Sequence, residues 1–296
     1  MPLCPERLER VRSIVREGVE RGEMPMAAVR VARHGEVLLA ETCGESAPGT
    51  PLQSHAIFRV YSMTKPVTAV AALILYERGC FHLGDPVSAY LPEFSGVRVV
   101  AGSARPPPRP ADALTMPTEP LTTPLTILHL FTHTAGLHSG NLAPRAQTLA
   151  EYAAAAASQP LLFEPGTQFR YGEGISVIGR LIEVWSGQPY DEFVRAEIFA
   201  PLEMADAHFS LPAHKRHRLV RQYRRTDSDG GGLLRDDGPE PVVAGPFVYQ
   251  ANGPEGYFPG PSGGMVCTIG DFLAFAQVSL SLSLSLSLSL SLSLTL

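Results

Sequence analysis

Strand-like segments lie on both sides of a mainly helical stretch, and this order constrains the fold more than any other feature. Two apolar runs, residues 26–33 and 37–42, flank the turn dipeptide His34-Gly35, a pattern that predicts a β-hairpin. Residues 265–268 predict a further strand late in the chain. Because helical patterns dominate between them, we expect a mixed α/β (α+β) fold with a helical region inserted between parts of one sheet.

Helical spacing of apolar residues recurs along the chain. Residues 63–78 are apolar on a broad face and end at Gly79, and Pro66 is tolerated because it falls in the first turn. Further helices are predicted over residues 5–22, 125–133, 147–158, 174–186 and 190–199, and from residue 271 onward. The proline-rich residues 101–124 and the glycine-rich residues 226–246 predict irregular surface loops.

Composition excludes several classes of protein. The net charge of −5 argues against a nucleic-acid partner, which normally requires a basic surplus. No stretch approaches the about 18 consecutive apolar residues that a membrane span needs. The four cysteines are far apart and form no CxxC pair, so we expect reduced thiols rather than a disulfide framework or a zinc site. No secretory or transit signal is recognisable at the start, and we expect a cytoplasmic protein.

The last residues have a different character from the rest. Ser-Leu is repeated from Ser279 to Leu294, which is the period of a strand, yet such a strand would be far longer than usual. A TC-dinucleotide repeat encodes the same alternation in any forward frame. Our hypothesis is that translation runs into a simple DNA repeat, and varied serine and leucine codons in the transcript would contradict it.

A serine and a lysine at the start of the apolar helix form the strongest chemical signal. In Ser62-Met63-Thr64-Lys65, the two side chains share one helix face, about 5–6 Å apart. A serine hydroxyl is a weak nucleophile until a neighbour removes its proton, and a partly buried lysine can take that proton. The alternative is a capping serine beside an exposed lysine. Because Lys65 and Lys215 are the only lysines, a chance lysine is less plausible than usual.

The surrounding sequence resembles a known family. FRVYSMTKPVTAVAALILYERG (58–79), LTILHLFTHTAGL (125–137), PGTQFRYGEGISVIGRLIEVWSGQPYDEF (165–193) and SGGMVCTIGDFLAF (262–275) are similar to the serine β-lactamase-related family. The likeness is strongest to class C-type β-lactamases and β-lactamase-fold esterases and transesterases. It implies a serine β-lactamase/penicillin-binding-protein-like fold, an antiparallel sheet flanked by helices plus a helical region. It also implies that Ser62 is the acylated nucleophile and Lys65 its partner base.

The family's second motif is Y-x-N, which Tyr171-Gly172-Glu173 matches in position. The resemblance therefore implies that Tyr171 is a general base, a role open to a phenol beside a lysine ammonium. Glu173 replaces the motif's asparagine, so we predict a substrate-binding carboxylate that disfavours anionic penicillins and favours esters.

The family's third motif, K-T-G or H-x-G on a C-terminal strand, has no match after Ala276. That strand normally lines the site and supplies an oxyanion-hole donor, whose loss costs about 10²–10³ in rate. We therefore expect residues 1–276 to form a β-lactamase-related domain truncated at its C-terminal end, followed by a Ser-Leu tail over 277–296.

Two other patterns are weaker. Gly260-Pro261-Ser262-Gly263-Gly264 matches the G-x-S-x-G elbow of α/β-hydrolases, but no histidine follows it and a strand rather than a helix is predicted next. His129 and His133 have i, i+4 spacing, which could serve a metal only with a further ligand nearby. We expect no metal and no organic cofactor.

The residues and the resemblance together predict a serine hydrolase or acyltransferase of small esters that works through an acyl-serine intermediate. Two alternatives stay open. One is a β-lactamase or D-alanyl peptidase-like hydrolase, and the other is a catalytically inactive scaffold or filament-former. The expected partner is a small-molecule ester or acyl donor, and the sequence leaves the oligomeric state open.

Overall fold

The computed structural model describes residues 4–102, 107–138, 148–226, 233–236 and 260–278. The chain divides into two compact units. The sheet unit comprises Met1–Arg59, Phe199–Val242 and Val266–Leu296, and the helical unit comprises Val60–Ile198 and Val243–Met265. Residues 62, 65, 171 and 173, which the sequence singles out for chemistry, all belong to the helical unit.

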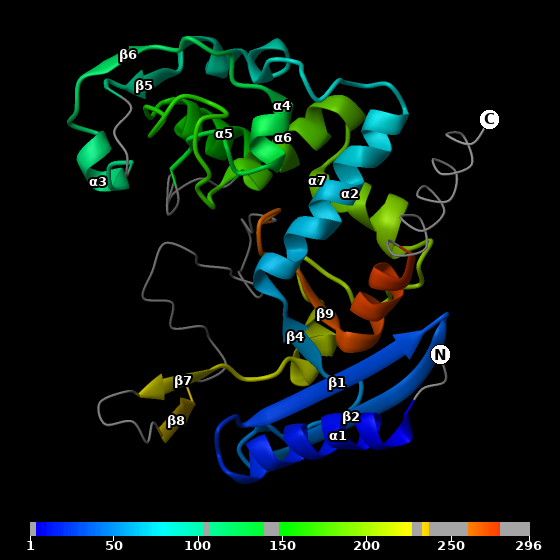
Figure 1. The fold of residues 1–296 in the computed structure, drawn as a ribbon. Helices are drawn as coiled ribbons and strands as arrows, with labels where there is room; N and C mark the ends of the chain where they lie inside the picture. Colours follow the sequence, from blue (N-terminus) through cyan, green and yellow to red (C-terminus); the bar gives the residue numbers. More distant parts are fainter. Residues whose placement is uncertain (1–3, 103–106, 139–147, 227–232, 237–259, 279–296) are drawn as a thin grey trace. The chain divides into compact units, whose positions relative to one another are not determined.

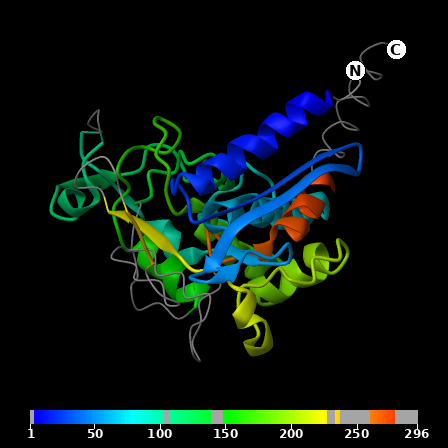
Figure 2. The same ribbon diagram turned by 90° about the horizontal axis from the view of Figure 1, so that it is seen from below.

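The sheet unit is built on the predicted hairpin. β1 (Met26–Arg33) pairs antiparallel with β2 (Glu36–Ala47), and β3 (Thr50–Pro51) adds a short third strand. The helix α1 (Pro5–Glu20) runs along this hairpin (Figures 1 and 2). The Arg16 guanidinium lies 2.7 Å from the Glu41 carboxylate of β2 and the Arg12 Nε lies 3.0 Å from it, so ion pairs hold the helix on the sheet.

A second strand pair joins residues from opposite ends of the sequence. β4 (Ile57–Arg59) pairs antiparallel with β9 (Val266–Thr268), with Ile57 opposite Thr268. Ile57, Val266 and Cys267 are fully buried, so apolar burial accompanies the backbone pairing. The helical region is thus inserted between two strands that pair, as predicted, but the partner of the late strand is β4 and not the hairpin, which forms a separate sheet. Residues 269–278 then form the helix predicted after the last strand.

The helical unit packs around one buried helix, α6 (Gly174–Ser186), whose residues Gly174–Gly179, Leu181 and Ile182 are all buried. Four helices contact it: α2 (Thr64–Glu77), α4 (Ile127–Phe131), α5 (Leu149–Ala157) and α7 (Tyr190–Val194) (Figure 1). Gly174 permits the contact with α4, because a Cβ there would lie 2.5 Å from the carbonyl oxygen of Leu130. A central helix buried on most sides gives the unit a rigid core.

Short elements occur in the described parts of the two segments that the sequence assigned to loops. Within 101–124 the structure contains α3 (Pro110–Ala113) and β6 (Thr118–Pro120), which pairs with β5 (Arg98–Val100). Within 226–246, β8 (Leu233–Asp236) pairs with β7 (Tyr223–Thr226). The loop predictions were therefore wrong at these points, because cross-strand backbone pairing compensates for weak local propensity. The tail at 279–296 lies outside the described residues.

Candidate active site

Ser62 lies in a tight turn directly before the apolar helix. The 3₁₀ turn η1 (Tyr61–Met63) leads into α2, and Ser62 is exposed there. Tyr61 has a φ of 45°, a left-handed conformation that is costly for a bulky residue. The buried Thr64 hydroxyl donates to the Tyr61 carbonyl oxygen at 2.7 Å and so stabilises this conformation. The turn therefore holds the serine at the surface on a fixed support.

Lys65 follows Ser62 by three residues, about one helical turn, so the two side chains lie on the same face. Its ammonium nitrogen is 3.2 Å from the Ser62 hydroxyl oxygen and 2.7 Å from the main-chain carbonyl oxygen of Ser262. An ammonium group has three donors, and these two contacts fix its direction. The lysine thus lies against the serine hydroxyl, and its second contact is to a main-chain oxygen.

Tyr171 approaches the same hydroxyl from another part of the chain. Its phenol donates to the Ser62 hydroxyl oxygen at 2.7 Å, and the Lys65 nitrogen lies 4.7 Å from the centre of its ring. The side chain is half exposed, so the serine, lysine and phenol lie at an accessible surface. The structure therefore brings together three side chains that the sequence singled out, with Ser62 in the middle.

The imidazole ring of His133 packs against the ring of Tyr171, a contact that the sequence did not reveal. The two ring centres are 4.6 Å apart, and the Gly172 N–H points at His133 Nδ1 at 3.4 Å. Burial lowers the pKa of His133, and the charge of Lys65 lowers it further. A neutral ring keeps a lone pair on Nδ1 for the Gly172 N–H. The signal available in the sequence was the H-T-A-G stretch, which only the resemblance made meaningful.

Glu173 does not share in the contacts around Ser62. Its carboxylate is 6% exposed and accepts a hydrogen bond from the Ser176 hydroxyl at 2.7 Å. The residue occupies the N-cap position of α6, where the helix dipole favours a negative charge. Its predicted substrate-binding role stays a prediction, and the structure gives its carboxylate a protein partner.

Ser262 is the second residue that the sequence reading missed. Its side chain is 2% exposed and its hydroxyl lies 2.7 Å from that of Ser176, while its carbonyl oxygen accepts from Lys65. The residues after it form the strand β9 rather than the helix of a nucleophile elbow. The G-x-S-x-G pattern thus surrounds a buried serine, and the strand predicted after it, in place of a helix, is present.

The two histidines at helical spacing are used separately. His129 Nδ1 lies 3.1 Å from the Thr126 hydroxyl and 3.2 Å from the Thr126 backbone nitrogen, completing the N-terminal cap of α4. His133 faces Tyr171 instead. In the part of the chain that the structure describes, no group of three or more histidine, cysteine, aspartate or glutamate side chains could hold a metal ion.

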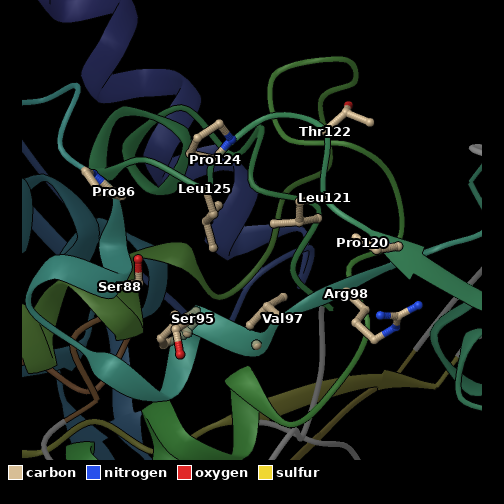
Figure 3. Close-up of a pocket in the computed structure, with 12 residues that line it drawn as sticks. Pro86, Ser88, Ser95, Val97, Arg98, Pro120, Leu121, Thr122, Pro124 and Leu125 are labelled. Atoms are coloured by element: carbon tan, nitrogen blue, oxygen red, sulfur yellow. The ribbon is translucent and has the colours of Figure 1, made fainter.

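A cavity of about 430 Å³ lies elsewhere in the helical unit (Figure 3). Val97, Leu121 and Leu125 point toward one another in it, whereas the Arg98 side chain points away (Figure 3). The lining residues are Pro86, Ser88, Phe94, Ser95, Gly96, Val97, Arg98, Pro120, Leu121, Thr122, Pro124 and Leu125. This lining contains no acid, histidine, lysine or cysteine, so it lacks a group suited to general acid or base chemistry.

Comparison with known proteins identifies the family. The family model described as Beta-lactamase matches residues 11–293 of this chain. The chain belongs to the beta-lactamase family. A solved structure of this fold, EstCE1, a hydrolase with promiscuous acyltransferase activity, superposes with a TM-score of 0.70 at 26% identity and covers 90% of this chain and 70% of its own. The serine β-lactamase/penicillin-binding-protein-like fold expected from the sequence is therefore confirmed.

Curated relatives of this beta-lactamase family member include esterases and acyltransferases. Esterase EstB of Burkholderia gladioli is 35% identical over 201 residues, which cover 62% of this chain and 46% of that protein. An uncharacterised protein of Mycobacterium tuberculosis is 29% identical over 279 residues, which cover 90% of this chain and 65% of that protein. The chain thus spans less than two thirds of the length of these relatives. Among its described helices, none is long and apolar enough to cross a membrane.

Proposed function

We propose that this chain is a serine hydrolase or acyltransferase that acts on small uncharged esters through an acyl-Ser62 intermediate. The observation that carries the proposal is the convergence of two proton-carrying groups on one exposed hydroxyl. Lys65 Nζ and the Tyr171 phenol lie 3.2 and 2.7 Å from the Ser62 oxygen. Both distances are within reach for direct proton transfer.

The proposed first step acylates the serine. The Ser62 oxygen forms a bond to the ester carbonyl carbon while its proton passes to whichever of Lys65 and Tyr171 is unprotonated. The Ser62 backbone N–H, near the start of α2, helps to stabilise the oxyanion that forms. The bond to the alkoxy group then breaks, and the leaving oxygen takes up the proton.

The second step removes the acyl group. Water or an alcohol forms a bond to the acyl-serine carbonyl carbon, and the attacking oxygen loses its proton to the same pair. The bond between the acyl carbon and the Ser62 oxygen then breaks, and the Ser62 oxygen takes up that proton. Water gives a carboxylic acid and an alcohol gives a new ester, so one site supports hydrolysis and transfer. The names of the relatives, an esterase and a hydrolase with acyltransferase activity, agree with this range.

The surface next to Ser62 favours a substrate with an uncharged, apolar acyl group. Met63 follows Ser62 and is 47% exposed, and Phe169, which packs edge-on against His133, is 69% exposed. Such apolar side chains are suited to contact the apolar part of a ligand bound at the serine. Because Glu173 is buried, its charge is not presented at this surface.

The direct test is the mass of the intact protein after exposure to a fluorophosphonate, on this chain and on Ser62→Ala. We expect a single adduct on the parent and none on the variant. Hydrolysis of p-nitrophenyl acetate should fall by about three orders of magnitude or more in Ser62→Ala. A folded parent chain without an adduct would contradict the proposal and favour an inactive scaffold. Rapid turnover of nitrocefin with little ester hydrolysis would favour a β-lactamase instead.

A further inference from the structure

We infer that Glu173, Ser176 and Ser262 form a buried hydrogen-bond chain that positions Lys65 against Ser62. The catalytic part of this inference rests on the function proposed above. The three residues are 6%, 3% and 2% exposed, respectively, so bulk water does not compete for their hydrogen bonds. The chain runs from the Glu173 carboxylate through two serine hydroxyls, each step 2.7 Å long.

The contact with Glu173 sets the direction of the hydroxyl groups. The Ser176 hydroxyl donates to the Glu173 carboxylate, and a serine hydroxyl has only one proton to donate. The Ser262 hydroxyl must therefore be the donor in the contact with Ser176. This leaves one arrangement of protons along the chain, which fixes the rotamer of Ser262.

The same residue holds the lysine through its main chain. Lys65 Nζ donates to the Ser262 carbonyl oxygen at 2.7 Å, a shorter contact than the 3.2 Å to the Ser62 hydroxyl. The preceding carbonyl, that of Pro261, accepts from the buried Thr68 hydroxyl at 2.7 Å. Helix α2 thus holds this short segment through the hydrogen bonds of Lys65 and Thr68, and helix α6 holds it through the hydrogen bond of Ser176.

This arrangement gives Glu173 a function at a distance from the reacting atoms. The segment at Ser262 carries the carbonyl oxygen that aims the Lys65 ammonium, and the chain of hydroxyls stops that segment from turning. We therefore class Glu173, Ser176 and Ser262 as positioning residues. Their removal should change the behaviour of Lys65 and the rate of acylation rather than the affinity for substrate.

Lysine labelling provides a test that does not depend on esterase activity. Lys65 and Lys215 are the only lysines, so trace acetylation with acetic anhydride and mass spectrometry yields one ratio with an internal reference. In Ser176→Ala and Ser262→Ala we expect labelling of Lys65 relative to Lys215 to rise about threefold or more. The reason is that a displaced Ser262 carbonyl no longer holds the Lys65 nitrogen in place, so the nitrogen is freer to reach the reagent. The matched control is Ser186→Ala, on the same helix, where the hydroxyl bonds only locally to Ile182 and Gln188.

The kinetic readout separates positioning from mere stability. With p-nitrophenyl acetate, we expect each alanine variant to lower kcat about 10-fold to 100-fold with little change in KM. In the variant that carries both Ser176→Ala and Ser262→Ala, kcat should be no lower than in the slower single variant, because either substitution alone already breaks the hydrogen-bond chain. Additive losses, a change in KM alone, or the same effect in Ser186→Ala would overturn the inference.

Two further results keep the inference open to refutation. If an alanine variant does not fold, Glu173→Gln keeps the shape but lets the amide donate to Ser176, so the proton order is no longer enforced. We expect the same direction of change in Lys65 labelling, and an unchanged ratio would refute the hydrogen-bond chain. If the parent chain shows no Ser62 adduct, the proposed function fails on its own, while the labelling ratio still decides whether the chain acts on Lys65.

Discussion

The phenol of Tyr171 donates a hydrogen bond to the Ser62 hydroxyl across 2.7 Å, although 109 residues separate them along the chain. Tyr171 lies three residues before the start of α6 and Ser62 lies two residues before the start of α2, and these two helices pack against each other. The contact therefore depends on helix packing in the helical unit.

Removal of this phenol should impair the reaction without unfolding the protein. In Tyr171→Phe we expect kcat for p-nitrophenyl acetate to fall about 10²-fold to 10⁴-fold, the range for loss of a general base. The half-exposed ring stays in place, so thermal unfolding should change little. Tyr76→Phe is the matched control, since that ring is 40% exposed and packs edge-on against Phe81. Full activity in Tyr171→Phe would contradict a catalytic phenol.

The buried hydroxyl of Thr64 should matter for stability. It donates to the Tyr61 carbonyl and accepts from the Met265 N–H at 3.2 Å. Thr64→Val keeps the shape but leaves both main-chain groups without this partner, so we expect unfolding in urea to become easier by about 1–3 kcal/mol. Thr64→Ser keeps the hydroxyl and should lose much less. Equal losses in the two variants would show that the methyl group, not the hydrogen bonds, matters.

Gly179 should tolerate no larger residue, because of the segment that carries Ser262. A Cβ at position 179 would overlap the ring of Pro261 and come within 2.8 Å of its Cβ. We expect Gly179→Ala to lower the free energy of unfolding by about 1–3 kcal/mol and to raise the labelling of Lys65. Gly84→Ala is the control, since no atom lies within 4 Å of a Cβ there. A neutral Gly179→Ala would mean that Pro261 moves aside freely.

Acid should destabilise the sheet unit in two separate pH ranges. Burial lowers the pKa of His208 from 6.5 to about 4, and the Lys215 and Arg218 charges contribute to this shift. The hydrogen bond from Arg218 lowers the pKa of Asp206 from 3.8 to about 2, with Lys215 adding to it. In both cases, between the two pKa values, the group is protonated in the unfolded chain but not in the folded chain, so a falling pH favours unfolding.

The free energy of unfolding should therefore fall as the pH falls from 6.5 to about 4, and again from 3.8 to about 2. Urea unfolding at a series of pH values measures both slopes. His208→Gln should lessen the loss of stability in the first range, and Asp206→Asn should lessen it in the second. If His208→Gln loses as much stability between pH 7 and 4 as the parent, another group is responsible for the first slope.

Several features of this protein could be predicted because they depend on local pattern. The hairpin around His34-Gly35 and the helix that follows Ser62 come from apolar spacing and from turn residues at their ends. The family resemblance added Tyr171, whose role residue spacing alone does not indicate. Weak local signals explain the errors, as in β8, where pairing with β7 stabilises a strand in a glycine-rich segment.

The sequence by itself predicted most of the elements and singled out side chains suited to chemistry, since periodicity, capping and side-chain type are local properties. Only the tertiary structure decided which of those groups meet. It brings Tyr171 and Ser62 together, buries Glu173 against Ser176, and uses the main chain of Ser262 to hold Lys65. The physical reason is that hydrogen bonds require atoms within about 3 Å, and such distances between residues far apart in sequence depend on how the helices pack.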